Sequence, residues 1–218
     1  DNVGGRTRAV MFDPNDSEWK KFWAGGVTGG LWFTDDITAS EPLWNKIDDF
    51  WDNIAVSCIA YDPVNTQIFY VGTGEIYTSA SRGFGIWKTT DGGSSWTRLS
   101  STDDFYWIND IVVRNENGTG VLYVAAGMNY YGGQWHYGTR GLLRSVDGGE
   151  TFTQVWSGSS GSLYQPSDLE IDANNNIWAG TRDNAYENGG GQILKSSDGT
   201  TWSMVYENTE SNRMELAC

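Results

Sequence analysis

Residue types that usually mark a disulfide-rich, histidine-dependent or membrane-spanning protein are scarce in this sequence of 218 residues. Two cysteines are too few for a disulfide framework, and Cys58 lies in the apolar run 54–61, where we expect a buried, unreactive thiol. The single histidine, His136, excludes within this chain both a nucleophile that needs a histidine base and a zinc site made of several histidines. No apolar run approaches the roughly 18 residues of a membrane-spanning helix, so we expect no membrane insertion.

Positive charge is also scarce, with 14 Lys and Arg against 28 Asp and Glu, which gives a net charge of −14. Such a surface repels phosphate backbones and anionic lipid, so we expect no nucleic-acid partner. Aromatic residues are plentiful instead, since 12 Trp, 11 Tyr and 8 Phe supply the apolar area for a core. The 28 glycines and 4 prolines together fall short of the roughly 25–30% typical of low-complexity chains, so the sequence indicates a folded domain.

A short motif recurs along the chain at nearly constant spacing. Its copies read TTDGGSSW at 89–96, SVDGGETF at 145–152 and, one residue shorter, SSDGTTW at 196–202, with a looser copy at 34–44. The shared aspartates are Asp36, Asp91, Asp147 and Asp198. An aspartate can accept hydrogen bonds from the backbone of its own turn, and the glycine permits a positive φ. We therefore predict a structural role for these four aspartates.

Each repeat also contains four short β-rich segments separated by Gly, Asp or Asn turns, the last one beginning at the aromatic residue of the motif. Four antiparallel strands in every unit of about 50 residues are typical of a β-propeller blade. The sequence thus predicts an all-β propeller over residues 1–218, with a β-sandwich as the alternative. The expected blades cover 5–47, 54–99, 107–156 and 166–206, and 209–218 is expected to be the first strand of a further blade in a larger propeller.

The motif resembles the Asp-box, or BNR repeat, of sialidases, sortilin-type receptors and xyloglucan-cleaving propeller hydrolases. The segments 2–9 and 24–32 are similar to those of secreted Bacteroidetes propellers exported by the type IX system. The resemblance implies an extracellular or cell-surface bacterial protein, with subunits of the secretion machinery as further partners. Because the sequence opens with Asp1 and shows no basic-then-apolar leader, we also expect a processed or excised piece.

Departures from these families argue against catalysis. The xyloglucan-cleaving relatives carry a catalytic base where this chain has Val27 and Thr28, neither of which can act as a base. The Arg-Ile-Pro signature of sialidases is absent, and we expect Arg6 and Arg8 to form a charged pair that anchors blade packing. Glycoside hydrolysis needs two carboxyl groups across the scissile bond. A hydrolase would therefore need catalytic residues from further blades.

Loops between second and third strands share one end of a propeller with the loops between blades, and function usually lies there. Carboxylates expected at that end are Glu75, Asp103, Asp104, Asp110 and Asp183. Glu75 follows the strand end and is the weak catalytic candidate, with a solvated loop acid as the alternative.

The loop 127–139 is the most distinctive segment, since it interleaves aromatic and polar residues. Such a loop suits stacking on sugar rings or docking of a partner, although it could equally pack over the rim of the propeller. The predicted ligand-binding residues are Tyr130, Tyr131, Trp135, His136, Arg182 and Asp183.

Calcium binding is a further hypothesis. The segment 172–176 (DANNN) places oxygen ligands at alternate positions, which could suit calcium, but Ile177 stands where an EF-hand loop requires glycine. We expect no other cofactor.

The sequence thus favours a secreted, non-catalytic propeller that serves as a binding or surface-display module, with a glycan or a protein as its ligand. One alternative is a sialidase- or xyloglucanase-like glycoside hydrolase whose catalytic residues lie partly in blades outside this chain. Another is a chain that serves chiefly as cargo of a secretion machine.

Overall fold

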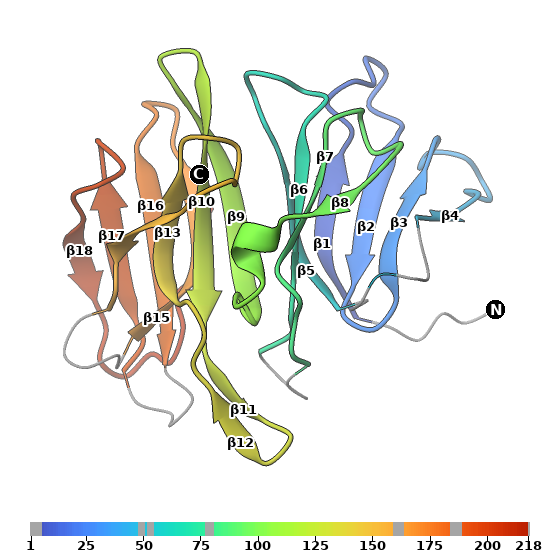
Figure 1. The fold of residues 1–218 in the computed structure, drawn as a ribbon. Helices are drawn as coiled ribbons and strands as arrows, with labels where there is room; N and C mark the ends of the chain where they lie inside the picture. Colours follow the sequence, from blue (N-terminus) through green and yellow to red (C-terminus); the bar gives the residue numbers. More distant parts are fainter. Residues whose placement is uncertain are drawn as a thin grey trace.

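The computed structural model describes residues 6–47, 51, 55–76, 81–158, 164–183 and 189–217. Four antiparallel sheets of four strands stand side by side, and a small hairpin projects from one end of the third (Figure 1). The prediction of an all-β propeller with four-stranded blades is confirmed. No helix in the part of the chain that the structure describes is long and apolar enough to cross a membrane.

The strands follow each other through the sheets in chain order. The first blade contains β1 (Thr7–Phe12), β2 (Phe22–Gly26), β3 (Gly30–Thr34) and β4 (Asn45–Lys46). The second contains β5 (Val56–Tyr61), β6 (Phe69–Thr73), β7 (Ile86–Thr89) and β8 (Thr97–Arg98). After the short 3-10 helix Ser100–Thr102, the third contains β9 (Trp107–Glu116), β10 (Thr119–Gly127), β13 (Gly141–Ser145) and β14 (Thr153–Trp156). The fourth contains β15 (Tyr164–Ile171), β16 (Ile177–Asp183), β17 (Gln192–Ser196) and β18 (Ser203–Glu207).

Three apolar cores lie between successive blades. In β6, Phe69 and Val71 face the first blade, while Tyr70 faces the third. In β10, Leu122 packs toward the second blade and Val121 toward the fourth in the same alternating way. Both faces of a central blade are therefore buried, as the two-residue period of a strand requires. A β-sandwich would have a single core between two sheets, so that alternative is wrong.

Small residues in the second strands let the next blade approach. A Cβ on Gly25 of β2 would lie 2.3 Å from Val56, and one on Gly72 of β6 would lie 2.6 Å from Ile108. A Cβ on Gly180 of β16 would likewise lie 2.5 Å from the carbonyl oxygen of Met214. The C-terminal segment thus takes, against the fourth blade, the place that β5 and β9 take against the blades before them.

That placement agrees with a further blade beginning in 209–218, which stays a prediction because residues 209–217 form no named strand and Cys218 lies outside the described residues. The segment is held to β16 by the Met214 N–H, which donates to the Thr181 carbonyl at 2.9 Å. The Asp183 N–H donates to the Asn212 carbonyl at 2.8 Å. Gly5 and Ile54, the first residues of two predicted blades, also lie outside the described residues.

Two details of the predicted strands were wrong. The last strand of each blade begins one residue after the motif's aromatic residue. In the second blade the Trp96 side chain packs back under its turn, and its indole N–H donates to the Gly93 carbonyl at 3.1 Å. The segment 127–139 is also not a simple loop, since it contains the hairpin of β11 (Asn129–Tyr131) and β12 (Gln134–His136).

Candidate functional site

The hairpin β11–β12 extends from the end of the molecule where second-to-third-strand loops lie (Figure 1). Its turn is Gly132-Gly133, and both glycines have positive φ (59° and 86°), as a tight two-residue turn requires. Tyr130 pairs with Trp135 across the hairpin. The sequence expectation of an irregular loop is thereby replaced by a rigid element that can aim its side chains.

One face of the hairpin presents three aromatic rings, which we call the aromatic strip: Tyr130, Trp135 and Tyr137. The Tyr130 and Trp135 rings meet edge to face with centroids 5.3 Å apart, and Trp135 and Tyr137 lie nearly parallel at 6.5 Å. Tyr130 and Tyr137 are 50% and 49% exposed, and Trp135 is half-buried. A group of adjacent exposed rings is a candidate interaction surface.

The opposite face of the hairpin carries His136, which packs onto the propeller, and Tyr131, which is 43% exposed. The His136 ring contacts Tyr106 and Trp107, with centroid distances of 5.8 and 6.0 Å. Tyr131 lies 6.3 Å from the same imidazole and its carbonyl is 3.2 Å from His136 Nε2. The structure thus separates the predicted ligand-binding residues, because Tyr130 and Trp135 belong to the strip while His136 anchors the hairpin.

Hydrogen bonds fix the base of the hairpin to three neighbouring elements. The Met128 N–H donates to Gln165 Oε1 at 2.6 Å, and Asn129 Nδ2 donates to the Ile76 carbonyl at 3.2 Å. On the other side, the Thr139 N–H donates to the Asp104 carbonyl at 3.1 Å. The strip is therefore held in a defined orientation above the second, third and fourth blades.

Glu75 is not a solvated loop acid. Its side chain is buried, with the residue 3% exposed, and Arg6 Nη2 lies 2.9 Å from Oε2 while Arg8 Nη1 lies 3.8 Å from Oε1. Its backbone also exchanges two hydrogen bonds with Ser81. Arg6 and Arg8 therefore join the first blade to the second through Glu75, and this carboxylate is committed to ion pairs rather than presented to a substrate.

Arg182 and Asp183 lie at the end of β16. Arg182 Nη2 forms an ion pair with Asp183 Oδ1 at 2.9 Å, and Arg182 also pairs with Arg213 as an isolated β-bridge. Both residues thus contact the C-terminal segment or each other. Residues 184–188, which follow them in the sequence, lie outside the described residues.

A cavity of about 230 Å³ lies at the inner strands of the four blades. Each inner strand has one extra residue at the same register position, a β-bulge, and all four extra residues line the cavity: Arg8, Ser57, Asn109 and Ser167. Asp110 and Asp168 follow two of these bulges. Burial, reinforced by the charge of Asp168, raises the pKa of Asp110 to about 8. Burial also raises the pKa of Asp168.

The Cys58 thiol lines the same cavity, and burial raises its pKa well above the ordinary value. The expectation of an unreactive thiol is consistent with this environment, because the thiolate is the reactive form.

The motif aspartates hold their own turns. Asp147 Oδ1 accepts from the Ser145 hydroxyl at 2.7 Å and from the Thr151 N–H at 3.0 Å, and the Thr151 hydroxyl donates to Oδ2 at 2.6 Å. Asp91 and Asp198 accept equivalent bonds, which lower the pKa of all three carboxyl groups, that of Asp91 to about 2 mainly through the Ser95 hydroxyl. Asp36 instead accepts from the N–H and hydroxyl of Thr38.

The residues that the sequence suggested as calcium ligands form hydrogen bonds within their own turn. Asp172 accepts hydrogen bonds from Asn174 and Asn176 and from the Trp178 indole N–H at 2.9 Å, so its carboxylate faces N–H donors. In the described ranges no group of three His, Cys, Asp or Glu side chains could hold a metal ion.

Comparison with known proteins gives the fold a context. No protein-family model matches the chain. A xyloglucanase from Paenibacillus sp. is 25% identical over 94% of this chain, which spans about a fifth (21%) of that enzyme. The structure of an ancestral GH74 enzyme superposes with a TM-score of 0.64 and 18% identity, over 92% of this chain and 25% of that one.

A second solved structure is similar to the same extent. The extracellular domain of a one-component system from B. thetaiotaomicron gives a TM-score of 0.61 at 13% identity, over 95% of this chain and 23% of that one. An enzyme and an extracellular domain of a one-component system thus share this architecture, so the fold does not decide between catalysis and binding. The chain has a β-propeller fold similar to that of these proteins, and it spans about a fifth to a quarter of their length.

Proposed function

We propose that this propeller segment binds a neutral β-glucan of the xyloglucan class through the aromatic strip. The observation that carries the proposal is the outward face of the hairpin, where Tyr130, Trp135 and Tyr137 form adjacent exposed rings. Aromatic side chains offer a large, rigid contact area at low entropic cost, which suits the apolar faces of sugar rings.

The charge of the protein argues for a neutral ligand. A net charge of −14 repels polyanions, so acidic glycans and sialosides are poor candidates. The similarity to a xyloglucanase along 94% of the chain supports a β-glucan in particular.

Titration calorimetry with a xyloglucan oligosaccharide tests the proposal. Trp135→Ala removes the central ring of the strip, and we expect about tenfold weaker binding or more, which corresponds to about 1.4 kcal/mol. Trp19→Ala is the matched control, because Trp19 is 63% exposed but lies on the first blade, and it should leave the affinity unchanged. Equal affinities of the wild type and the Trp135→Ala variant would contradict the proposal.

Hydrolysis of the same glycan is the second candidate, favoured by the 25% identity to a xyloglucanase. Among the carboxylates predicted for this end of the propeller, Glu75 is occupied by Arg6 and Arg8, whereas Asp104 is exposed at the base of the hairpin. Release of reducing ends from xyloglucan, abolished in Asp104→Asn but not in Asp103→Asn, would establish this candidate. If the protein binds xyloglucan but releases no reducing ends from it, the non-catalytic function is supported.

We also propose that the protein works outside the cell, and the similar fold of an extracellular domain supports this location. Export by a type IX system and contact with its subunits remain predictions from the resemblance of the segments 2–9 and 24–32. Residues 2–5 of the first segment lie outside the described residues.

A further inference from the structure

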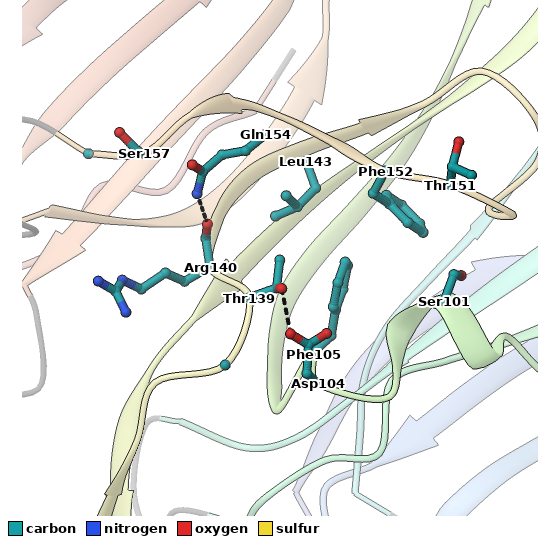
Figure 2. Close-up of a pocket in the computed structure, with 12 residues that line it drawn as sticks. Ser101, Asp104, Phe105, Thr139, Arg140, Leu143, Thr151, Phe152, Gln154 and Ser157 are labelled. Carbon is teal, nitrogen blue, oxygen red and sulfur yellow. Dashed lines mark hydrogen bonds between the residues drawn. The ribbon is translucent and has the colours of Figure 1, made fainter.

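A groove of about 680 Å³ opens between the second and third blades, next to the base of the hairpin (Figure 2). Its apolar floor consists of Phe105, Leu143 and Phe152, and the two phenylalanine rings meet at a centroid distance of 5.1 Å. Phe105 and Leu143 are buried and Phe152 is half-buried, so the floor is part of the packed interblade core.

The rim of the groove is polar and mostly uncharged. It is formed by Ser101, Asp104, Thr139, Arg140, Thr151, Gln154 and Ser157 (Figure 2). Gln154 Nε2 donates to the Arg140 carbonyl, which leaves the amide oxygen as an acceptor. Asp104 Oδ2 accepts a hydrogen bond from the Thr139 hydroxyl at 2.6 Å, so Oδ1 is the oxygen that can accept from a ligand. An apolar floor beneath such acceptors suits a ligand with one apolar face and a rim of hydroxyl donors.

Three consecutive residues join this groove to the aromatic strip. Gly138, Thr139 and Arg140 follow Tyr137 directly and line the groove. The Arg140 guanidinium lies 5.7 Å from the centre of the Tyr137 ring. Gly138 has a φ of +50°, and a Cβ there would lie 2.3 Å from the Asp104 carbonyl oxygen, so this connection is pressed tightly against the interblade loop. The groove and the strip are therefore fixed relative to each other.

We infer that the groove is a second saccharide subsite, which takes a pyranose unit of the glycan whose neighbouring units stack on the strip. This inference rests on the proposed function and adds the position and chemistry of another contact. The unit lies over the half-buried Phe152 ring, and its hydroxyls donate to the Gln154 amide oxygen and to Asp104 Oδ1. The unit comes either from the main chain of the glucan or from a side branch.

Binding by two variants on adjacent positions of β14 tests the subsite. Gln154→Leu removes the rim amide at similar size, whereas Thr153→Val changes the neighbouring residue, which does not line the groove. Both are exposed, and a thermal unfolding curve for each confirms that the fold is retained. The probes are a xyloglucan oligosaccharide and linear cellohexaose, each titrated calorimetrically against the wild type and both variants.

We expect Gln154→Leu to weaken binding about three- to tenfold, the range for one hydrogen bond, and Thr153→Val to leave it unchanged. If Gln154→Leu weakens the binding of both probes, the subsite takes a main-chain unit. If it weakens the binding of the branched xyloglucan oligosaccharide alone, the subsite takes a unit of a branch. Unchanged affinity of Gln154→Leu for both probes, while Trp135→Ala still weakens binding, would overturn the subsite and leave the proposed function intact. If Trp135→Ala also has no effect, the proposed function itself fails.

Discussion

Asp110 and Asp168 occupy the same position on successive inner strands, directly after a bulge in each. The carboxylate of Asp110 accepts a hydrogen bond from the Leu169 N–H at 2.8 Å, and that of Asp168 accepts one from the Leu216 N–H. Each side chain thus connects its own blade to the segment that follows. The arrangement places two acidic groups close together in the cavity that Arg8, Arg213 and Glu215 also line.

This pair predicts an unusual loss of stability with rising pH. The folded pKa of Asp110, about 8, lies above its ordinary value of 3.8, so the fold favours the protonated group. The resulting stabilisation is complete below the ordinary value and is lost as the pH rises toward 8. We expect Asp110→Asn, which stays neutral, to make the free energy of unfolding less dependent on pH between 5 and 9.

Denaturant unfolding of the wild type and of Asp110→Asn at several pH values in that interval measures the effect. Asp103→Asn is the control, because this exposed carboxylate forms its ion pair with Arg98 at the surface. The quantity of interest is the free energy of unfolding of the wild type minus that of Asp110→Asn. If this difference is not smaller at pH 9 than at pH 5, the raised pKa of Asp110 is contradicted.

Single residues were also the hardest part of the site to predict. Glu75 follows a strand end, a position typical of a solvated loop acid, and its ion pairs come from arginines of another blade. Likewise, nothing local to Asp110 indicates that Asp168 will lie beside it. Such pairings depend on which strands become neighbours, and the local sequence does not contain that information.

At the scale of elements, the repeated motif was sufficient to predict the sheets but not the hairpin. The twin glycines Gly132-Gly133, flanked by aromatic residues, are a known signal for a two-residue hairpin turn. Applied to the segment 127–139, that signal would have predicted β11 and β12, and the alternation of strands would then have separated Tyr130 from Tyr131.

The second strands pack closely against the next blade. We therefore expect a methyl group added to a glycine at this contact to destabilise the fold, and one added to a glycine elsewhere to have little effect. A Cβ on Gly72 of β6 would lie 2.5 Å from Cys58 Sγ and 2.6 Å from Ile108 Cγ2. We expect Gly72→Ala to lower the free energy of unfolding by about 1–3 kcal/mol, the usual cost of overpacking a core.

Chemical denaturation compares this variant with Gly29→Ala, where the nearest atom to the added Cβ is Trp32 Nε1 at 3.9 Å. The Gly29→Ala variant should unfold close to the wild type. A Gly72→Ala variant as stable as Gly29→Ala would show that the blades are not packed as described.

For the whole molecule, the regular spacing of the motif gave the correct architecture because each copy specifies one complete sheet. Blades stacked in chain order follow from that regularity, and three interblade cores result. Function does not follow in the same way, since the proposed ligand-binding surface lies in the hairpin β11–β12, which among the described residues belongs to the third blade. The similarity to a xyloglucanase, together with this hairpin, leads to glycan binding as the central claim.

A crystal structure of the protein soaked with a xyloglucan oligosaccharide tests that claim most directly. The account predicts sugar rings stacked on Tyr130, Trp135 and Tyr137, with a further unit in the groove beside Gln154. An ordered oligosaccharide bound in the cavity at the inner strands, with the three rings bare, would contradict it.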